Sequence, residues 1–247
     1  MMKKLSLLII LIGILILGVS ARDANKFYVG LTGGYTYDVI RTDTGYRTDI
    51  SYKGSHGFDV GIPFGYQITD YFGISSGITY IQKNYRIEHY YPSYTIATPF
   101  EFQNLTNHYI ELPLTLDFTL SNDIYSFTAS AGGYIGYWVA SQKSGASYGS
   151  SSNWAGTEGL MNYYSGTYKF TQADNRFEAG LLFRLGFEVE LDPVILFLRG
   201  TYSLGLTDMR RKQAINYSPL INDTIAAEVG MLWGFGGEKW KSLNYFY

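Results

Sequence analysis

Charged residues in this sequence stand at alternate positions of otherwise apolar segments. In residues 109–120, YIELPLTLDFTL, Glu111 and Asp117 alternate with leucine, isoleucine and phenylalanine. Carboxylates and arginines are tolerated in such a setting when they pair with one another and are well hydrogen-bonded. The sequence therefore predicts a buried, structural ion-pair network in which two arginines bridge several carboxylates. Its predicted members are Asp59, Glu111, Asp117, Glu178, Arg184, Glu188, Arg199 and Glu228.

Residues for catalysis or metal binding are scarce by comparison. The chain has three histidines, His56, His89 and His108, and no serine or acid stands at a spacing that fixes a catalytic triad with them. No cluster of histidine, aspartate and glutamate shows the spacing of metal ligands. Cysteine is absent, which excludes a disulfide framework and a lipid-anchored N-terminus. We expect no catalytic residue, no metal site and no cofactor.

The charged positions belong to segments with strict period-two alternation, which is the pattern of a β-strand with one apolar face. Eight such segments predict eight strands, at 27–37, 57–69, 72–85, 109–120, 124–140, 176–191, 194–206 and 224–235. The connections alternate in length. Tight turns are predicted at 69–71, 121–123 and 192–193, and long polar loops at 38–56, 86–106, 141–175 and 207–222. This is the plan of antiparallel up-and-down strands with turns at one end and loops at the other.

Three features place the apolar face outward, in lipid. The polar face is rich in glycine, serine and threonine with few charges, which suits a cramped interior. The apolar face is long enough for the outward band of a tilted spanning strand of about 9–11 residues. Aromatic residues gather near both ends of the strands, as two membrane interfaces select. We predict an all-β fold, an eight-stranded antiparallel up-and-down transmembrane β-barrel, which is too narrow for a wide channel.

The ends of the chain are predicted to lie outside the barrel. Residues 1–21 combine a basic start, an apolar stretch and a small-residue cleavage site, which predicts a signal peptide. The barrel then occupies residues 22–235, and residues 236–247 form a periplasmic C-terminal tail. Removal of Lys3 and Lys4 leaves 17 of the 19 basic residues against 21 acids, so nucleic acid is not an expected partner. The expected location is the bacterial cell outer membrane, in contact with its lipids.

The chain resembles the PorT-like outer membrane β-barrel proteins common in Bacteroidetes in four segments: YIELPLTLDF, GGYIGYWVA, RFEAGLLFRLGFEVEL and LRGTYSLGLTDM. The resemblance extends from about Phe27 to Phe235. Glu111 and Pro113 match the family's E-x-P strand, and residues 199–206 match its arginine-to-leucine segment. The resemblance implies an eight-stranded outer membrane barrel. Because one member is associated with type IX secretion, it also adds components of that apparatus to the candidate partners.

The function expected from these features is structural, or binding through the long loops, without catalysis. Loops on a rigid scaffold are the usual place for recognition, and these loops hold many tyrosines: Tyr46, Tyr52, Tyr90, Tyr91, Tyr94, Tyr148, Tyr163, Tyr164 and Tyr168. Three alternatives stay open. They are a lipid-modifying enzyme of acyltransferase or deacylase type, a narrow gated ion-conducting barrel, and a soluble ligand-binding barrel of lipocalin type.

Overall fold

The structure is a computed structural model that describes residues 24–43, 49–90, 101–122, 124–148, 161–191, 193–211 and 218–236. The predicted signal peptide, 1–21, and all but the first residue of the predicted tail, 236–247, lie outside these ranges, as do Tyr46, Tyr91 and Tyr94. Within the described ranges, no helix is long and apolar enough to span a membrane.

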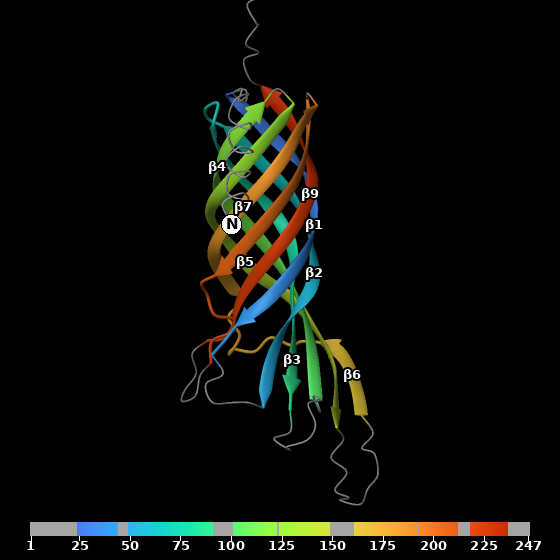
Figure 1. Cartoon of the computed structure of the whole chain (residues 1–247). Coiled ribbons are helices and arrows are strands. Elements are labelled where there is room, and N and C mark those ends of the chain that lie inside the picture. The colour runs from blue at the N-terminus through green and yellow to red at the C-terminus, as the bar shows by residue number, and fades with distance from the viewer. Residues whose placement is uncertain are drawn as a thin grey trace, which may run out of the picture.

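Nine strands form one antiparallel sheet among the described residues (Figure 1). They are β1 (Lys26–Arg41), β2 (Ile50–Gln67), β3 (Phe72–His89), β4 (Glu101–Asn122), β5 (Tyr125–Tyr148), β6 (Met161–Thr167), β7 (Phe177–Leu191), β8 (Val194–Gly205) and β9 (Ile221–Gly236). Eight of them close into a ring in the order β1-β2-β3-β4-β5-β7-β8-β9. The ring is closed by β1 and β9, which pair from Lys26↔Gly236 to Arg41↔Ile221. The predicted eight-stranded up-and-down barrel is confirmed.

The ninth strand, β6, corrects the prediction of a long loop over 141–175. Strand β5 continues to Tyr148, and its last residues pair with β6 from Gln142↔Thr167 to Tyr148↔Met161. Strands β2, β3 and β4 also run into segments predicted as loops. The alternation of apolar and polar residues fades there because both faces of the sheet leave the membrane, so the pattern that marks a strand in the barrel is lost.

These continuations form a projection that we call the sheet extension, comprising residues 50–54, 85–89, 101–107, 141–148 and 161–167. Strand β1 follows β2 only as far as Ser55, and β7 follows β5 only as far as Tyr137. The five strands of the extension therefore leave the barrel on one side, as the lower part of Figure 1 shows. Strand β6 is the last strand in the sheet order and forms an edge of the extension.

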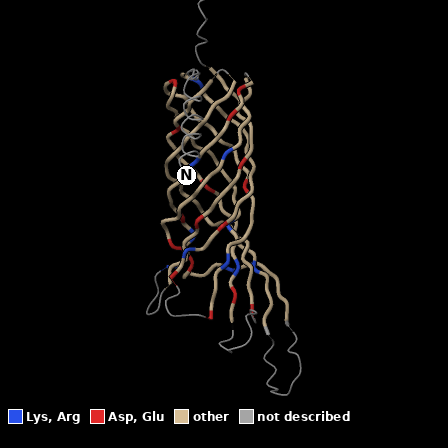
Figure 2. Tube along the Cα trace, viewed as in Figure 1, with Lys and Arg blue, Asp and Glu red and all other residues tan. Residues whose placement is uncertain are grey.

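The two faces of the barrel wall are arranged as predicted. Leu114, Phe183 and Val229 point outward, with exposed fractions of 61%, 47% and 59%. The alternate positions, such as Glu111 and Glu228, are buried inside. Figure 2 shows the charged residues distributed along the barrel and gathered near its loop end.

The register of the sheet is kept across Pro113, which has no backbone N–H to donate and at which the β3–β4 pairing is interrupted. The register between β3 and β4 is unchanged on either side of this residue, from Ser76↔Leu114 to Thr79↔Glu111. The Ser76 hydroxyl donates a 2.7 Å hydrogen bond to the Pro113 carbonyl. This bond satisfies the Pro113 carbonyl and does not replace the missing N–H donor. Register shifts occur elsewhere, between Gly54 and Asp59 in β2 and at His108/Tyr109 in β4.

Candidate functional site: the closed lumen

The centre of the lumen is a lysine that the sequence analysis did not include. Lys83 on β3 has no exposed surface, and its Nζ lies 2.7 Å from Glu111 Oε1 on β4 and 2.5 Å from Glu178 Oε1 on β7. Both carboxylates were among the predicted network residues. A buried charge in this setting is tolerable only when it is paired and hydrogen-bonded, and one ammonium group between two carboxylates meets that requirement.

Aromatic and amide groups complete the surroundings of Lys83. Its Nζ lies 4.7 Å from the ring centroid of Tyr134 and 5.4 Å from that of Tyr109, within the range of cation–π attraction. The Tyr134 hydroxyl donates to Glu178 Oε1 at 2.7 Å, and the Asn222 amide donates to Glu178 Oε2 at 3.1 Å. We call Lys83, Glu111, Tyr134, Glu178 and Asn222 the lysine cluster. It joins strands on opposite sides of the barrel and fills the lumen at this level.

A second ion pair lies closer to the turn end of the barrel. Arg199 and Glu228 are directly opposite each other on β8 and β9. Arg199 donates twice to this carboxylate, from Nε at 2.9 Å and from Nη2 at 3.1 Å. The Thr201 hydroxyl donates to the same carboxylate. This two-point geometry is the strong form of an arginine–carboxylate pair.

Arg184, the other predicted arginine, differs from Arg199 in its surroundings. It is buried, and its Nε has no hydrogen-bond partner. Asp117 instead accepts a bond from Thr115, and Glu188 accepts one from Thr128. Arg184, Asp117 and Glu188 line a small lumen cavity of about 70 Å³ in the turn half of the barrel. Arg199 lines the same cavity, so the two arginines differ in their bonding: Arg199 holds a carboxylate with two hydrogen bonds, and the Nε of Arg184 has no hydrogen-bond partner.

Two buried aspartates lie in different environments. Asp59, a predicted network residue on β2, has both carboxylate oxygens buried without a hydrogen-bond partner. Asp38 on β1 was not predicted. It is fully buried and accepts bonds from the Thr224 hydroxyl at 2.6 Å and from the backbone N–H of Asn84 at 3.0 Å. Asp38 thereby satisfies a β3 backbone group next to the irregularity in β2.

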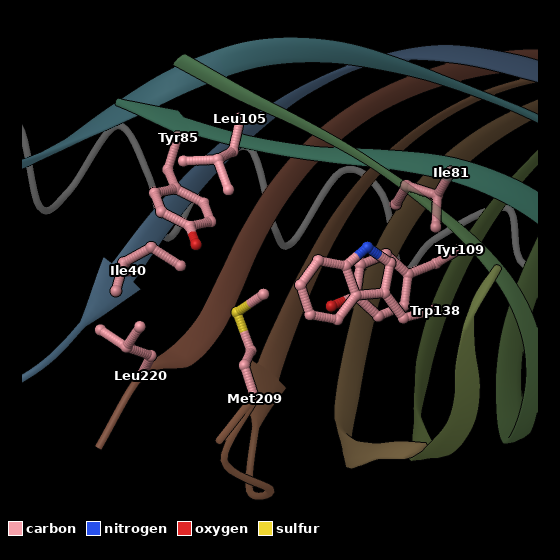
Figure 3. Close-up of a cluster of buried hydrophobic side chains, with 8 residues drawn as sticks. All are labelled: Ile40, Ile81, Tyr85, Leu105, Tyr109, Trp138, Met209 and Leu220. Atoms are coloured by element: carbon pink, nitrogen blue, oxygen red, sulfur yellow. The ribbon is translucent and has the colours of Figure 1, made fainter. Parts of the chain in front are cut away.

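The loop end of the lumen is closed by a cluster of buried apolar side chains, which we call the aromatic cap. Its members, drawn in Figure 3, are Ile40, Ile81, Tyr85, Leu105, Tyr109, Trp138, Met209 and Leu220. Trp138 stacks on Tyr109, with ring centroids 5.8 Å apart and planes 7° apart, and on Tyr168 at 5.9 Å and 15°. Met209 and Leu220 come from the connection between β8 and β9, which the sequence analysis treated only as a loop.

Two connecting segments hold the cap in place. Residues Asp174 and Arg210 form an isolated antiparallel bridge between the β6–β7 and β8–β9 connections. The guanidinium of Arg176 lies 4.3 Å from the Phe170 ring centroid and donates to the Trp138 carbonyl at 2.8 Å. The cap therefore closes the lumen above the lysine cluster, and the two layers meet at Tyr109, whose ring also faces Lys83.

The histidines do not assemble a catalytic arrangement with these groups. His56 is hydrogen-bonded to the Tyr35 hydroxyl, and His108 Nδ1 lies 2.5 Å from the Tyr80 hydroxyl. Both pairs lie on the wall near the loop end and not in the lumen. In the part of the chain that the structure describes, no group of three or more histidine, aspartate and glutamate residues is placed to hold a metal ion.

Comparison with known proteins agrees with this architecture. Residues 20–211 match the family model described as outer membrane protein beta-barrel domain, and the chain belongs to that family. It is accordingly a bacterial outer membrane protein. No curated protein matches the sequence.

Three solved structures show similarity to the chain at low sequence identity. OprG from Pseudomonas aeruginosa is 11% identical, with 88% of this chain and 99% of that chain covered and a TM-score of 0.47. The attachment invasion locus protein Ail of Yersinia pestis is 12% identical, with coverage of 86% and 99% and a TM-score of 0.38. Neisserial surface protein A is 13% identical, with coverage of 85% and 97% and a TM-score of 0.43.

Proposed function

We propose that this protein is a closed, non-enzymatic outer membrane barrel that acts by binding other molecules through its sheet extension. The proposal rests on the difference between the lumen of the barrel and the sheet extension. The lumen is filled by buried side chains, whereas five strands continue beyond the barrel rim and present a broad surface. In outer membrane barrels the short turns are periplasmic and the long connections are extracellular. We therefore place the extension outside the cell.

The filled lumen argues against conduction. Lys83, Tyr109, Tyr134 and Trp138 come from three different strands, and none is more than 3% exposed. An eight-stranded barrel is narrow enough for side chains to occupy its whole cross-section. An ion would have to displace both the aromatic cap and the lysine cluster to pass. We assign these groups, together with the Arg199–Glu228 pair, a structural role.

The extension has the properties of a recognition surface. It is an ordered sheet on a rigid scaffold, and functional contacts are usually made by segments held in that way. Strand β6, with the sequence MNYYSGT, has no charge and no proline, the features that normally protect an edge strand. Tyr163 on this strand is 76% exposed. Tyrosine supplies large contact area at low entropic cost.

The identity of a protein partner is a separate proposal. The resemblance to PorT-like barrels makes components of the type IX secretion apparatus the first candidates. The non-enzymatic assignment is supported by the histidines, since His56 and His108 are each engaged with a tyrosine hydroxyl on the barrel wall. Their position gives neither a nucleophile nor an acid to activate.

Two measurements test the proposal. The full-length mature protein, inserted in a planar lipid bilayer, should give no single-channel events at moderate voltage. Photo-crosslinking residues introduced in cells at Gln103 and Asn162, both on the extension, should capture discrete partners that a crosslinker at Tyr71, at the turn end, does not capture. Regular conductance steps would contradict the closed barrel, and identical crosslinking patterns at all three positions would contradict recognition by the extension.

A further inference from the structure

The outward face of the sheet extension contains a groove formed by cross-strand pairing. Phe102, Ala146 and Tyr163 lie opposite one another on β4, β5 and β6, and Asn104, Ser144 and Ser165 form the adjacent row. Residues in such rows point to the same face of a sheet. On β5, Ser144 and Gly145 form the floor of a groove between larger side chains on β4 and β6, whereas Ala146 is fully covered by its neighbours. The resulting groove has a volume of about 360 Å³.

The walls and floor of this groove have the chemistry of a saccharide site. Phe102 and Tyr163 offer aromatic rings on which the apolar face of a sugar ring can stack, because the face of an aromatic ring is electron-rich and attracts C–H groups. Asn104, Ser144 and Ser165 offer amide and hydroxyl groups that both donate and accept hydrogen bonds. The residues that line the groove carry no formal charge, so they contribute ring stacking and hydrogen bonds, and any charge contact comes from residues beside the groove. The volume lies within the usual range for small-ligand sites.

The position of the groove relative to the membrane indicates which saccharide lies next to it. Along β4, the outward row runs from the exposed Leu114 and Leu112 through His108, which is bonded to Tyr80, to Asn104 and Phe102. The groove is thus on the lipid-facing side of the wall, beyond the hydrocarbon level. The outer leaflet of a bacterial outer membrane presents, in the same order, acyl chains, phosphate groups and a saccharide headgroup.

Basic residues lie beside the groove, in the same cross-strand row as Asn104. Lys53 on β2 and Arg86 on β3 are directly opposite each other on the outward face, and Arg86 is opposite Asn104. Arg86 is paired with Glu88 at 2.9 Å and lies 4.0 Å from the Phe102 ring centroid, whereas Lys53 is exposed. Like charges directly opposite in a sheet repel each other, and an anionic group near Lys53 would offset that repulsion.

We propose that the groove between Phe102 and Tyr163 binds the core saccharide of lipopolysaccharide in the surrounding outer leaflet, with Lys53 facing its phosphate groups. The inference rests on the proposed function, since it names the ligand of one face of the extension. It makes the extension a contact with the glycolipid layer around the barrel. The β6 edge stays available for other partners.

The test measures binding of two defined glycolipids to the full-length mature protein in mild detergent by native mass spectrometry. Rough lipopolysaccharide, which carries the core saccharide, should bind about tenfold more tightly than lipid A, which lacks it. Tyr163→Ala and Asn104→Ala should each reduce the preference for rough lipopolysaccharide by about fivefold or more and leave lipid A binding unchanged. Lys53→Gln should weaken binding of both glycolipids.

Matched controls separate the groove from general surface effects. Tyr71→Ala removes an exposed tyrosine at the turn end, and Lys169→Gln removes an exposed lysine outside the groove; both should bind like the unmodified protein. Every variant must migrate as a folded barrel in unheated detergent gels. Equal affinity for the two glycolipids, or full binding by Tyr163→Ala, would overturn the proposal, as would equally tight binding of free core saccharide without lipid. None of these results bears on the conductance and crosslinking tests of the proposed function.

Discussion

Lys83 on β3 and Glu178 on β7 meet across the lumen with 2.5 Å between Nζ and Oε1, although their strands are not neighbours in the sheet. The contact therefore crosses the barrel interior and does not follow the wall. Glu111 adds a second carboxylate to the same ammonium group at 2.7 Å. The lysine cluster links strands through the interior of the barrel, so its loss should lower the free energy of unfolding.

Replacing Lys83 with methionine should destabilise the barrel by about 3–5 kcal/mol, because Glu111 and Glu178 would be left buried without their cation. The measurement is the free energy of unfolding in urea, with the protein inserted in phospholipid vesicles. Lys53→Met, at an exposed site, should change the free energy of unfolding by less than about 0.5 kcal/mol.

A compensated variant distinguishes unpaired charge from lost packing at the same site. Combining Lys83→Met with Glu111→Gln and Glu178→Gln should recover at least half of the lost stability, since the uncompensated carboxylates are gone. Unfolding of Lys83→Met at the same urea concentration as the unmodified barrel would show that the lysine cluster contributes nothing to stability.

The two lumen arginines should differ in their coupling to Glu228. A double-mutant cycle of Arg199→Gln and Glu228→Gln should give an interaction energy of about 1–3 kcal/mol, because Arg199 holds this carboxylate with two hydrogen bonds. The corresponding cycle with Arg184→Gln should give a clearly smaller coupling, because the two hydrogen bonds of Arg199 hold this carboxylate and Arg184 Nε has no hydrogen-bond partner. Equal coupling for the two arginines would mean that the charges form one shared network.

The barrel itself could be predicted from the sequence because every strand in the membrane has one face in lipid and one in the lumen. That division imposes the period of two, as in YIELPLTLDFTL, and it placed Glu111 and Glu228 correctly inside the barrel. Lys83 lies on the same face of its strand as the lumen-facing Thr79 and Ile81. The apolar alternation of the strand ends near this position, so the sequence pattern does not mark Lys83 as a lumen residue.

Two other features left little signal in the pattern. Strand β6 and the end of β5 lie beyond the strands that show the apolar alternation, so the pattern does not mark them, and only the structure shows that they pair. The aromatic cap draws Met209 and Leu220 from a connection that is largely polar in sequence. Which partner each lumen charge takes depends on distances across the barrel, which strand order alone does not give. This is why the two arginines could not be distinguished.

The hydroxyl of Tyr168, which lies after β6 and packs on Trp138, should lose its proton only at unusually high pH. Burial, together with the hydrogen bond that this hydroxyl donates to Asp174 at 3.0 Å, raises the pKa of Tyr168 from 10.0 to about 12. The folded state thus favours the protonated form. This contribution to stability is complete below pH 10 and is lost as the pH rises from 10 toward 12.

Ultraviolet absorption of the phenolate measures this shift. The difference between the titration curves of the unmodified protein and Tyr168→Phe should have its midpoint near pH 12. A midpoint near 10 for Tyr168 would show that this residue is in water and that the cap is open.

The aromatic cap and the lysine cluster should act as two barriers in series. Trp138→Ala removes a buried side chain that packs between Tyr109 and Tyr168, so it should cost about 3–5 kcal/mol and open the loop end of the lumen. Backbone amides near Met209 should then exchange hydrogen faster. The bilayer should nevertheless remain silent in single-channel recording, because Lys83 and its carboxylates still fill the lumen below. Ile135→Ala, at an exposed position on the same strand, should leave amide exchange near Met209 unchanged. Conductance in Trp138→Ala would show that the cap alone closes the barrel, and unchanged exchange would show that Trp138 does not hold it.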